Sequence, residues 1–121
     1  CWVCCTYAHV WIMIKGIGVD IVETDRFAQH TVSFAHLILS DAEFDEFYNS
    51  QKPTEYLATR FAAKEAAIKA VGRKVPFLAI QVVNDRYGKP QLRFLANHVF
   101  NQASLSISHD KGFVVAMVVL E

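Results

Sequence analysis

The feature that most constrains the fold is an alanine-rich stretch in the middle of the chain, residues 60–70, which reads RFAAKEAAIKA. Alanine and long unbranched side chains have the highest helix propensities, so this stretch strongly favours a helix. Gly72, followed by two basic residues, is typical of a helix C-terminus. We therefore predict a helix over residues 54–71 and expect the rest of the chain to pack around it.

One acidic residue lies in the apolar stripe of this predicted helix. At about 3.6 residues per turn, Glu65 shares a stripe with Leu57, Phe61 and Ile68, and its other neighbours are mostly alanines. A carboxylate on a buried face is unfavourable by several kcal/mol unless a cation or hydrogen-bond donors meet it. Two interpretations stay open: Glu65 pairs with Lys69 one turn later, or it has a metal-binding or catalytic role.

Length and composition indicate a single folded domain. With 121 residues, of which 53% are hydrophobic and 20% charged, the chain can form one modest core. We expect a site on so small a body to lie between subunits, and the slight apolar excess suits an oligomer. The formal net charge is zero, so the sequence gives no global signal for binding nucleic acid or a membrane.

The charges are nevertheless unevenly distributed. Acidic residues crowd residues 41–46, whereas basic residues lie on and just after the predicted central helix: Arg60, Lys64, Lys69, Arg73 and Lys74. This basic cluster suits phosphate groups or an acidic partner, and a solvated helix face is the alternative interpretation.

The first twelve residues differ in character from the rest. They are apolar, yet they are too short to span a bilayer and lack the basic start and cleavage site of a signal peptide. We expect an extension of doubtful status over residues 1–12 and a single domain over residues 13–121. All three cysteines lie in the first five residues, which predicts no disulfide framework and favours a reducing, cytoplasmic location.

Residues 13–23 alternate in the manner of a strand. On one face of this strand, Asp20 follows Gly16 and Gly18. Glycines weaken a strand, so their presence indicates that a backbone or a ligand approaches closely beside Asp20. The two glycines do not complete a dinucleotide-binding fingerprint, because Ile21 stands where the third glycine is needed.

The remaining segments predict short helices and antiparallel strands. We expect helices at residues 24–27, at 41–48 behind a capping box that begins at Ser40, and at 97–102. Strands are expected at residues 78–83, 91–95, 104–109 and 113–120. The fold class is therefore α+β, with helices packed on a mainly antiparallel sheet. The last strand is apolar on both faces, so it should be covered on both, as an interior strand is.

Three residues need one explanation: Asp20 beside glycines, Glu65 on an apolar face, and His109 at the end of a strand of serines. Two hard carboxylates with no thiolate nearby in the sequence suit Mg²⁺, which typically takes one or two carboxylates together with water and substrate phosphate. The basic residues around Glu65 fit a substrate that bears phosphate.

Three motifs, in this order, resemble the signature of the holo-[acyl-carrier-protein] synthases, the small bacterial class of 4′-phosphopantetheinyl transferases. They are GIGVDIVE at residues 16–23, RFAAKEA at 60–66 and SISH at 106–109. The resemblance runs over residues 13–121 and includes ND at 84–85 and GKP at 88–90. This sequence departs from the family in a shorter loop after Gly72, in DKG at 110–112, and in the extension 1–12, which has no counterpart.

The resemblance implies a 4′-phosphopantetheinyl transferase-like fold. The implied activity is transfer of the phosphopantetheine arm of coenzyme A to a serine of apo acyl carrier protein, with release of adenosine 3′,5′-bisphosphate, in support of fatty acid synthesis. It also implies Mg²⁺ as cofactor, held by Asp20 and Glu65, with Glu65 as the candidate that accepts the serine proton. Taken singly, Asp20 could cap the next helix and His109 could be a core histidine; their joint occurrence in the family's order favours the site.

The same resemblance assigns roles to basic residues and implies a homotrimer. Lys64 and Lys69 would face phosphate oxygens, Arg60 and His109 would meet the 3′-phosphate of coenzyme A, and Arg26 would dock the acidic carrier protein. Three active sites would lie between subunits, each taking His109 from the neighbour. Two other functions stay open: a non-catalytic trimeric module that binds carrier protein or nucleotide, and a transferase for peptidyl carriers, which is usually about twice this length.

Overall fold

The computed structural model describes residues 13–29, 31–95 and 102–121. The expected extension 1–12 lies outside these ranges, as does the helix expected at 97–102 except for Gln102, which is in neither helix nor strand. The described elements follow one another in this order: β1 (Gly16–Glu23), η1 (Thr24–Phe27), α2 (Thr31–Ile38), α3 (Asp41–Tyr48), α4 (Pro53–Val71), η2 (Phe77–Ala79), β2 (Ile80–Asn84), β3 (Pro90–Phe94), β4 (Ala103–Asp110) and β5 (Phe113–Leu120).

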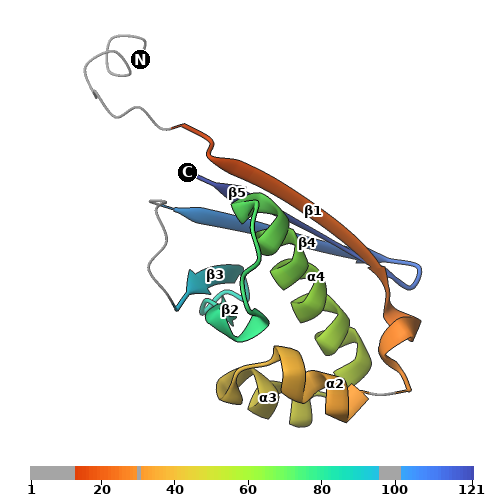
Figure 1. Cartoon of the computed structure of the whole chain (residues 1–121). Helices are drawn as coiled ribbons and strands as arrows, with labels where there is room; N and C mark the ends of the chain where they lie inside the picture. Colours follow the sequence, from red (N-terminus) through yellow and green to blue (C-terminus); the bar gives the residue numbers. More distant parts are fainter. Residues whose placement is uncertain (1–12, 30, 96–101) are drawn as a thin grey trace.

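The long helix α4 is the centre of the fold, as predicted (Figure 1). It has Pro53 in its first turn and is followed by Gly72, whose φ of 82° is a left-handed conformation that glycine adopts without strain. It lies across one face of an antiparallel sheet with strand order β1-β5-β4. The helices α2 and α3 and the separate β2-β3 sheet pack around its other sides.

Alanines, rather than large apolar residues, mark the buried face of α4. Ala62, Ala63, Ala66 and Ala67 are completely buried. In the predicted stripe only Leu57 is buried, whereas Phe61, Glu65 and Ile68 are half-buried. The prediction of a buried Glu65 stripe is therefore corrected, because close packing against α4 selects the smallest side chains.

Strand β1 packs directly on the backbone of α4. A Cβ at Gly16 would lie 1.9 Å from the Ala70 carbonyl oxygen, and one at Gly18 would lie 1.8 Å from the Ala66 carbonyl oxygen. No side chain fits at either position. The predicted close approach beside Asp20 is confirmed, and the approaching group is the helix backbone.

The α+β prediction is confirmed, with differences at particular elements. The capping box forms, since Ser40 N–H donates to Glu43 Oε1 over 2.9 Å and Glu43 N–H donates back to Ser40 Oγ. Helix α2 was not predicted, because β-branched and aromatic residues in it have low helix propensity. The strands expected from residues 13 and 78 begin at Gly16 and Ile80. Within the described ranges, none of the helices is long and apolar enough to cross a membrane.

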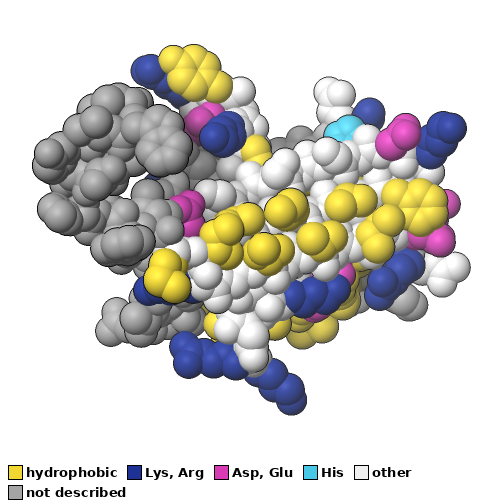
Figure 2. Space-filling view, turned by 90° about the horizontal axis from the view of Figure 1, so that it is seen from above, with side chains coloured by type: hydrophobic (Ala, Val, Ile, Leu, Met, Phe, Trp, Pro, Cys, Tyr) yellow, Lys and Arg dark blue, Asp and Glu magenta, His cyan; other side chains and the backbone are white. Residues whose placement is uncertain are grey.

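The β1-β5-β4 sheet buries the face toward α4 and exposes the outer face. On the inner face of β5, Val114, Ala116 and Val118 are completely buried. On the outer face, five large apolar side chains of β1 and β5 are between 42% and 61% exposed: Ile17, Val19, Ile21, Phe113 and Met117. Figure 2 shows apolar side chains as a band across this face. One chain thus covers β5 on one side only, so the cover expected for the other side would have to come from another molecule.

Candidate active site

Asp20 lies on β1, on the face that carries the two glycines and meets α4. Its side chain is 13% exposed, and Oδ1 accepts a hydrogen bond from Lys69 Nζ over 3.1 Å. The same Nζ donates to the Val19 carbonyl oxygen over 3.0 Å. The other carboxylate oxygen, Oδ2, is buried and has no hydrogen-bond partner in the described part of the chain. A buried carboxylate oxygen without a partner is unfavourable, so this atom is where a cation or a further donor would bind.

Glu65 lies on α4 one turn before Lys69. Residues four apart lie on the same side of a helix, so the contact between Lys69 and Asp20 places Glu65 on the side of α4 that faces the Asp20 carboxylate. No ion pair of Glu65 forms among the residues described, and Lys69 pairs with Asp20 instead. The interpretation in which Glu65 pairs with Lys69 is therefore wrong.

These two carboxylates fit a hard divalent cation. No group of three or more His, Cys, Asp or Glu side chains suited to a metal occurs in residues 13–29, 31–95 and 102–121. A site here would thus have two carboxylate ligands at most, with water and substrate phosphate completing the shell, which is the arrangement Mg²⁺ commonly takes. The unpartnered Oδ2 of Asp20 and the carboxylate of Glu65 can supply them.

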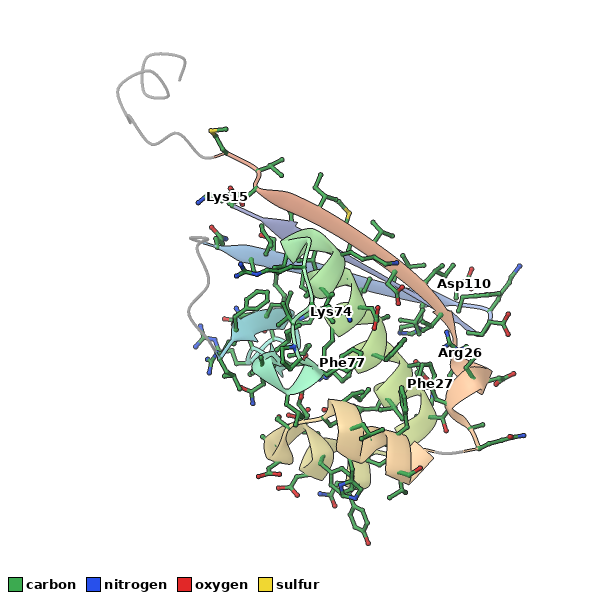
Figure 3. The ribbon with its side chains drawn as sticks, in the orientation of Figure 1. Lys15, Arg26, Phe27, Lys74, Phe77 and Asp110 are labelled. Atoms are coloured by element: carbon green, nitrogen blue, oxygen red, sulfur yellow. The ribbon has the colours of Figure 1, made fainter. Side chains whose placement is uncertain are left out.

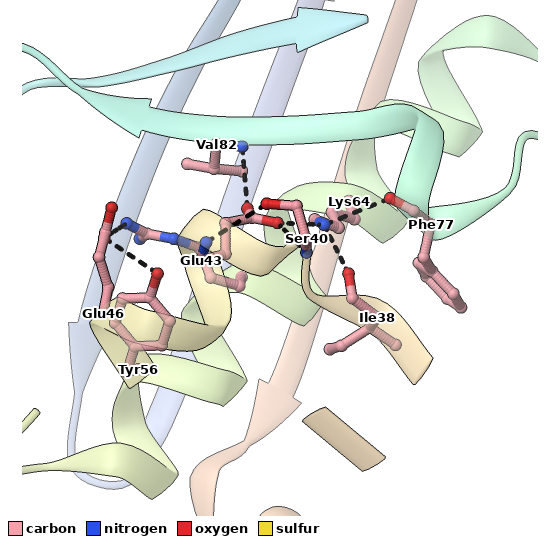
Figure 4. A network of polar contacts seen from close by, with 9 residues as sticks. Ile38, Ser40, Glu43, Glu46, Tyr56, Lys64, Phe77 and Val82 are labelled. Carbon is pink, nitrogen blue, oxygen red and sulfur yellow. Dashed lines mark hydrogen bonds and ion pairs between the residues drawn. The ribbon is translucent and has the colours of Figure 1, made fainter. Parts of the chain in front are cut away.

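Lys64 does not face this site. Its side chain is completely buried, and Nζ donates to Glu43 Oε1 over 2.7 Å, to the Ile38 carbonyl over 2.5 Å and to the Phe77 carbonyl over 3.2 Å (Figure 4). Burial lowers the pKa of the Lys64 ammonium, and the carboxylate of Glu43 opposes that shift. Because three donors already have three acceptors, none is left for a phosphate oxygen. The expected contact of Lys64 with phosphate is corrected accordingly.

Glu43 completes the network around Lys64. Its side chain is 1% exposed, and its Oε2 accepts a hydrogen bond from Val82 N–H over 3.0 Å. The ion pair thereby joins α2, α3, α4, η2 and β2 (Figure 4). Sequence reasoning treated Glu43 only as a capping residue, because it is 21 residues from Lys64 and nothing local links the two.

Arg60, expected at the 3′-phosphate, is held within the chain. Its guanidinium carbon lies 4.4 Å from the Tyr56 ring centroid, and Nη2 lies 3.5 Å from Glu46 Oε2. That same oxygen accepts a hydrogen bond from the Tyr56 hydroxyl over 3.0 Å, and burial raises the pKa of Tyr56 well above its ordinary value. Arg60 Nε is buried without a partner in the part of the chain that is described. The contact of Arg60 with a phosphate stays a prediction.

His109 lies near the end of β4, two strands away from Asp20 in the same sheet. Its side chain is 61% exposed, and Nδ1 lies 3.5 Å from Glu55 Oε1 in the first turn of α4. Asp20, by contrast, contacts Lys69 in the last turn of that helix. In the sheet, Asp20 is level with Ile107 of β4, with β5 between them, so the Cα atoms of Asp20 and His109 are roughly 12 Å apart at the usual strand spacings. One chain therefore does not bring His109 to the two carboxylates.

Arg26 lies in η1, directly after β1 (Figure 3). It is exposed, and its guanidinium carbon lies 5.6 Å from the ring centroid of Phe27 and 5.8 Å from that of Phe61. It also lines a pocket with Phe113 and other residues at the end of β1. Aromatic support of this kind holds a cation at the surface, where an acidic partner can reach it.

The chain and its fold belong to a known family. The family model described as the 4′-phosphopantetheinyl transferase superfamily matches residues 16–118, and the chain belongs to this superfamily. Within it, the chain is similar to the holo-[acyl-carrier-protein] synthase of Bacillus cereus (strain AH187), with 44% identity over 118 residues, which cover 90% of this chain and 97% of the relative. The corresponding synthase of Oceanobacillus iheyensis is 41% identical over 117 residues, covering 90% and 98%.

Solved structures show the same likeness. The holo-[acyl-carrier-protein] synthase of Neisseria meningitidis has a TM-score of 0.80 and 37% identity, covering 90% of this chain and 99% of that one. The synthase of Bacillus anthracis, solved in complex with CoA (3′,5′-ADP), has a TM-score of 0.79 and 44% identity, covering 90% and 97%. The resemblance to this family and the predicted fold class are both confirmed.

Proposed function

We propose that this chain transfers the 4′-phosphopantetheine arm of coenzyme A to a serine of apo acyl carrier protein. The products are holo acyl carrier protein and adenosine 3′,5′-bisphosphate, and the reaction supports fatty acid synthesis in the cytoplasm. The observation that carries the proposal is the buried, unpartnered Oδ2 of Asp20 beside the helix that presents Glu65. Relatives named holo-[acyl-carrier-protein] synthase, and the Bacillus anthracis structure with coenzyme A, support the same substrates here.

Asp20 and Glu65 are the proposed ligands of Mg²⁺. When bound, the ion would supply charge stabilisation at the pyrophosphate of coenzyme A. The chain's own contribution is position, because β1 carries Asp20 on a backbone that rests directly on α4 at Gly18. The two carboxylates therefore come from two elements whose backbones are in direct contact.

The proposed reaction is a displacement at phosphorus. The serine oxygen of the carrier forms a bond to the phosphorus that bears the pantetheine arm, and the bond from that phosphorus to the adenosine 3′,5′-bisphosphate oxygen breaks. The serine proton passes to Glu65, whose carboxylate has no ion-pair partner in the described residues. Most of the rate enhancement in such reactions comes from positioning and charge neutralisation.

Lys69 is the lysine best placed to meet the phosphates. Its side chain is 53% exposed, and its Nζ bonds to Asp20 Oδ1. A divalent cation on Asp20 competes with this ammonium for the same carboxylate. Because the Lys69 side chain is half-exposed, water screens its charge and can take the place of Asp20 as its partner, so Nζ can leave Asp20 and turn to a phosphate oxygen.

The complete site is proposed to lie between subunits of a homotrimer. The apolar outer face of β1 and β5 supports an interface, since exposed patches of this kind mark protein contacts. The separation of His109 from Asp20 within one chain supports it too. In the trimer, His109 of a neighbouring subunit and Arg60 would meet the 3′-phosphate of coenzyme A.

Mixing two inactive variants tests this arrangement. Glu65→Ala and His109→Ala should each be inactive as pure trimers, and a mixture should regain part of the activity because some mixed trimers rebuild one intact interface. Light scattering that shows an active monomer would contradict the trimer. So would a mixture that stays inactive after subunit exchange.

The activity itself is tested by mass spectrometry of the carrier protein. Incubation with coenzyme A, Mg²⁺ and apo acyl carrier protein should add phosphopantetheine to the carrier serine, and Asp20→Ala and Glu65→Ala should abolish the product while the protein stays folded. A non-catalytic module would bind coenzyme A and leave the carrier unmodified. A preference for a peptidyl carrier over the acyl carrier would favour the third function considered.

A further inference from the structure

The buried ion pair of Lys64 and Glu43 takes no part in the reaction described above. Both side chains are at most 1% exposed, and every polar atom they carry has a partner: the carbonyls of Ile38 and Phe77 and the N–H groups of Ser40 and Val82. A buried ion pair seldom adds net stability, because desolvation offsets the attraction between its charges. Its directional bonds can instead specify one geometry over its alternatives.

We propose that Lys64 and Glu43 are positioning residues for the metal site, fixing the rotation of α4 and so the direction of Glu65. The proposal rests on the proposed function, in which Glu65 is a metal ligand. Consecutive helix residues are about 100° apart around the axis. Once Lys64 is held toward α3 and η2, its neighbour Glu65 is turned toward β1 and Asp20.

The face of α4 toward the sheet is held by close packing rather than by buried hydrogen bonds. The face toward the sheet consists of alanines at most 5% exposed, and β1 opposes it with Gly16 and Gly18. Alanine methyl groups form no directional bonds, so this face sets the distance between α4 and β1, and the hydrogen bonds from α4 to β1 come from the flexible, half-exposed Lys69. Hydrogen bonds, by contrast, weaken steeply with distance and angle.

The Lys64 network supplies that directional control from several elements at once. Nζ bonds to the last residue of α2, to α3 and to η2, while Glu43 reaches β2 through Val82 N–H. A shift of α4 by about 1 Å would carry these bonds beyond the usual 2.7–3.2 Å range. A misplacement of that size can reduce the rate of a positioned reaction on the order of 100-fold.

The test is the double variant Lys64→Met/Glu43→Gln, which removes both charges and keeps side chains of similar length. The amide introduced at position 43 can still accept from Val82 N–H and donate to a backbone carbonyl, so the fold should persist in circular dichroism and thermal melts. We expect the Mn²⁺ affinity of the free protein, measured by electron paramagnetic resonance, to fall at least fivefold. We also expect kcat to fall at least tenfold with an unchanged KM for the carrier.

Leu105→Ala is the control for a simple loss of stability. Leu105 is a buried residue of β4 whose cross-strand partner is Val118 of β5, and neither residue belongs to the Lys64 network, so its truncation destabilises the protein without removing a bond of that network. Mn²⁺ affinity in this variant should stay within twofold of wild type. If the double variant does not fold, Glu43→Gln alone is measured in the same way.

Wild-type Mn²⁺ affinity and kcat in the pair variant would overturn the positioning role. So would an equal loss in Leu105→Ala, because the effect would then follow stability alone. Asp20→Ala and Glu65→Ala, measured alongside, separate this proposal from the proposed function. If they lose Mn²⁺ while the pair variant keeps it, only the positioning role fails; if they keep it, the metal assignment fails and the positioning role fails with it.

Discussion

Replacing Gly18 with alanine should force β1 away from α4. The new Cβ would lie 1.8 Å from the Ala66 carbonyl oxygen, whereas real Cβ atoms essentially never come within 3.0 Å of such an atom. Strand and helix must therefore part by roughly 1 Å, since neither atom can be moved by changing a rotamer. Asp20 lies two residues further along the same face of β1, so the displacement reaches the proposed site.

Gly18→Ala should lower stability moderately and activity strongly. Overpacking of a core costs about 1–3 kcal/mol, and a contact with rigid backbone puts Gly18→Ala toward the upper end of that range. For a domain of this size, Tm should fall by about 5–15 °C. A shift of about 1 Å between the two carboxylates should reduce transfer on the order of 100-fold.

Thermal melts and initial rates of carrier modification measure both effects on the same preparation. Gly88→Ala is the matched control, because Gly88 has a φ of 84° but nothing within 4 Å of its would-be Cβ. Alanine there strains a turn without pressing on α4, so we expect a lower Tm with near-normal transfer. Wild-type Tm and rate in Gly18→Ala would refute the backbone contact on which this reasoning depends.

Four further variants test other parts of the structure. Lys64→Met alone leaves the Glu43 carboxylate buried without its cation, so the free energy of unfolding in urea should fall by about 3–5 kcal/mol. Burial raises the pKa of Tyr56 above its ordinary 10.0. As the pH rises past 10, the unfolded chain loses this proton before the folded chain does, so the stability of the wild type should fall. Thermal melts of Tyr56→Phe should show a smaller fall in stability over the same pH range. Arg26→Glu should weaken carrier binding in calorimetry far more than coenzyme A binding, and the difference should shrink with salt as the Debye length falls below about 10 Å. Lys69→Met should bind Mn²⁺ more tightly when no substrate is present, and it should bind coenzyme A more weakly. Lys74→Met, at an exposed lysine, should change neither affinity.

The elements predicted well were those with local signals. The alanine run with its terminal glycine identified α4, and the spacing of Ser40 and Glu43 identified the start of α3. Helix α2 has no such signal, because its helicity depends on packing against α4 and η2 rather than on propensity. The offset at β2 has the same origin, since Pro76 precedes a short 3-10 turn where a strand was expected.

The candidate site was predictable only in part. The three motifs identified Asp20 and Glu65 through their order, but periodicity alone assigned the buried face of α4 to its large residues. The alanines form that face instead, and this turns Lys64 inward and leaves Glu65 half-buried. The side-chain partners of Lys64 and Lys69 lie 21 and 49 residues away, and pairing over such separations depends on the folded chain.

Because the apolar face of β1 and β5 is open in one chain, the activity of the proposed trimer should depend on the concentration of the protein. In the proposed trimer, each newly synthesised subunit exposes Ile17, Val19 and Ile21 until two further copies arrive. Under dissociating conditions the number of complete trimers scales with about the third power of subunit concentration, so halving expression would remove far more than half of the assembled sites. Unassembled subunits would meanwhile present a flat hydrophobic strand surface to the rest of the proteome, where it can nucleate aggregates.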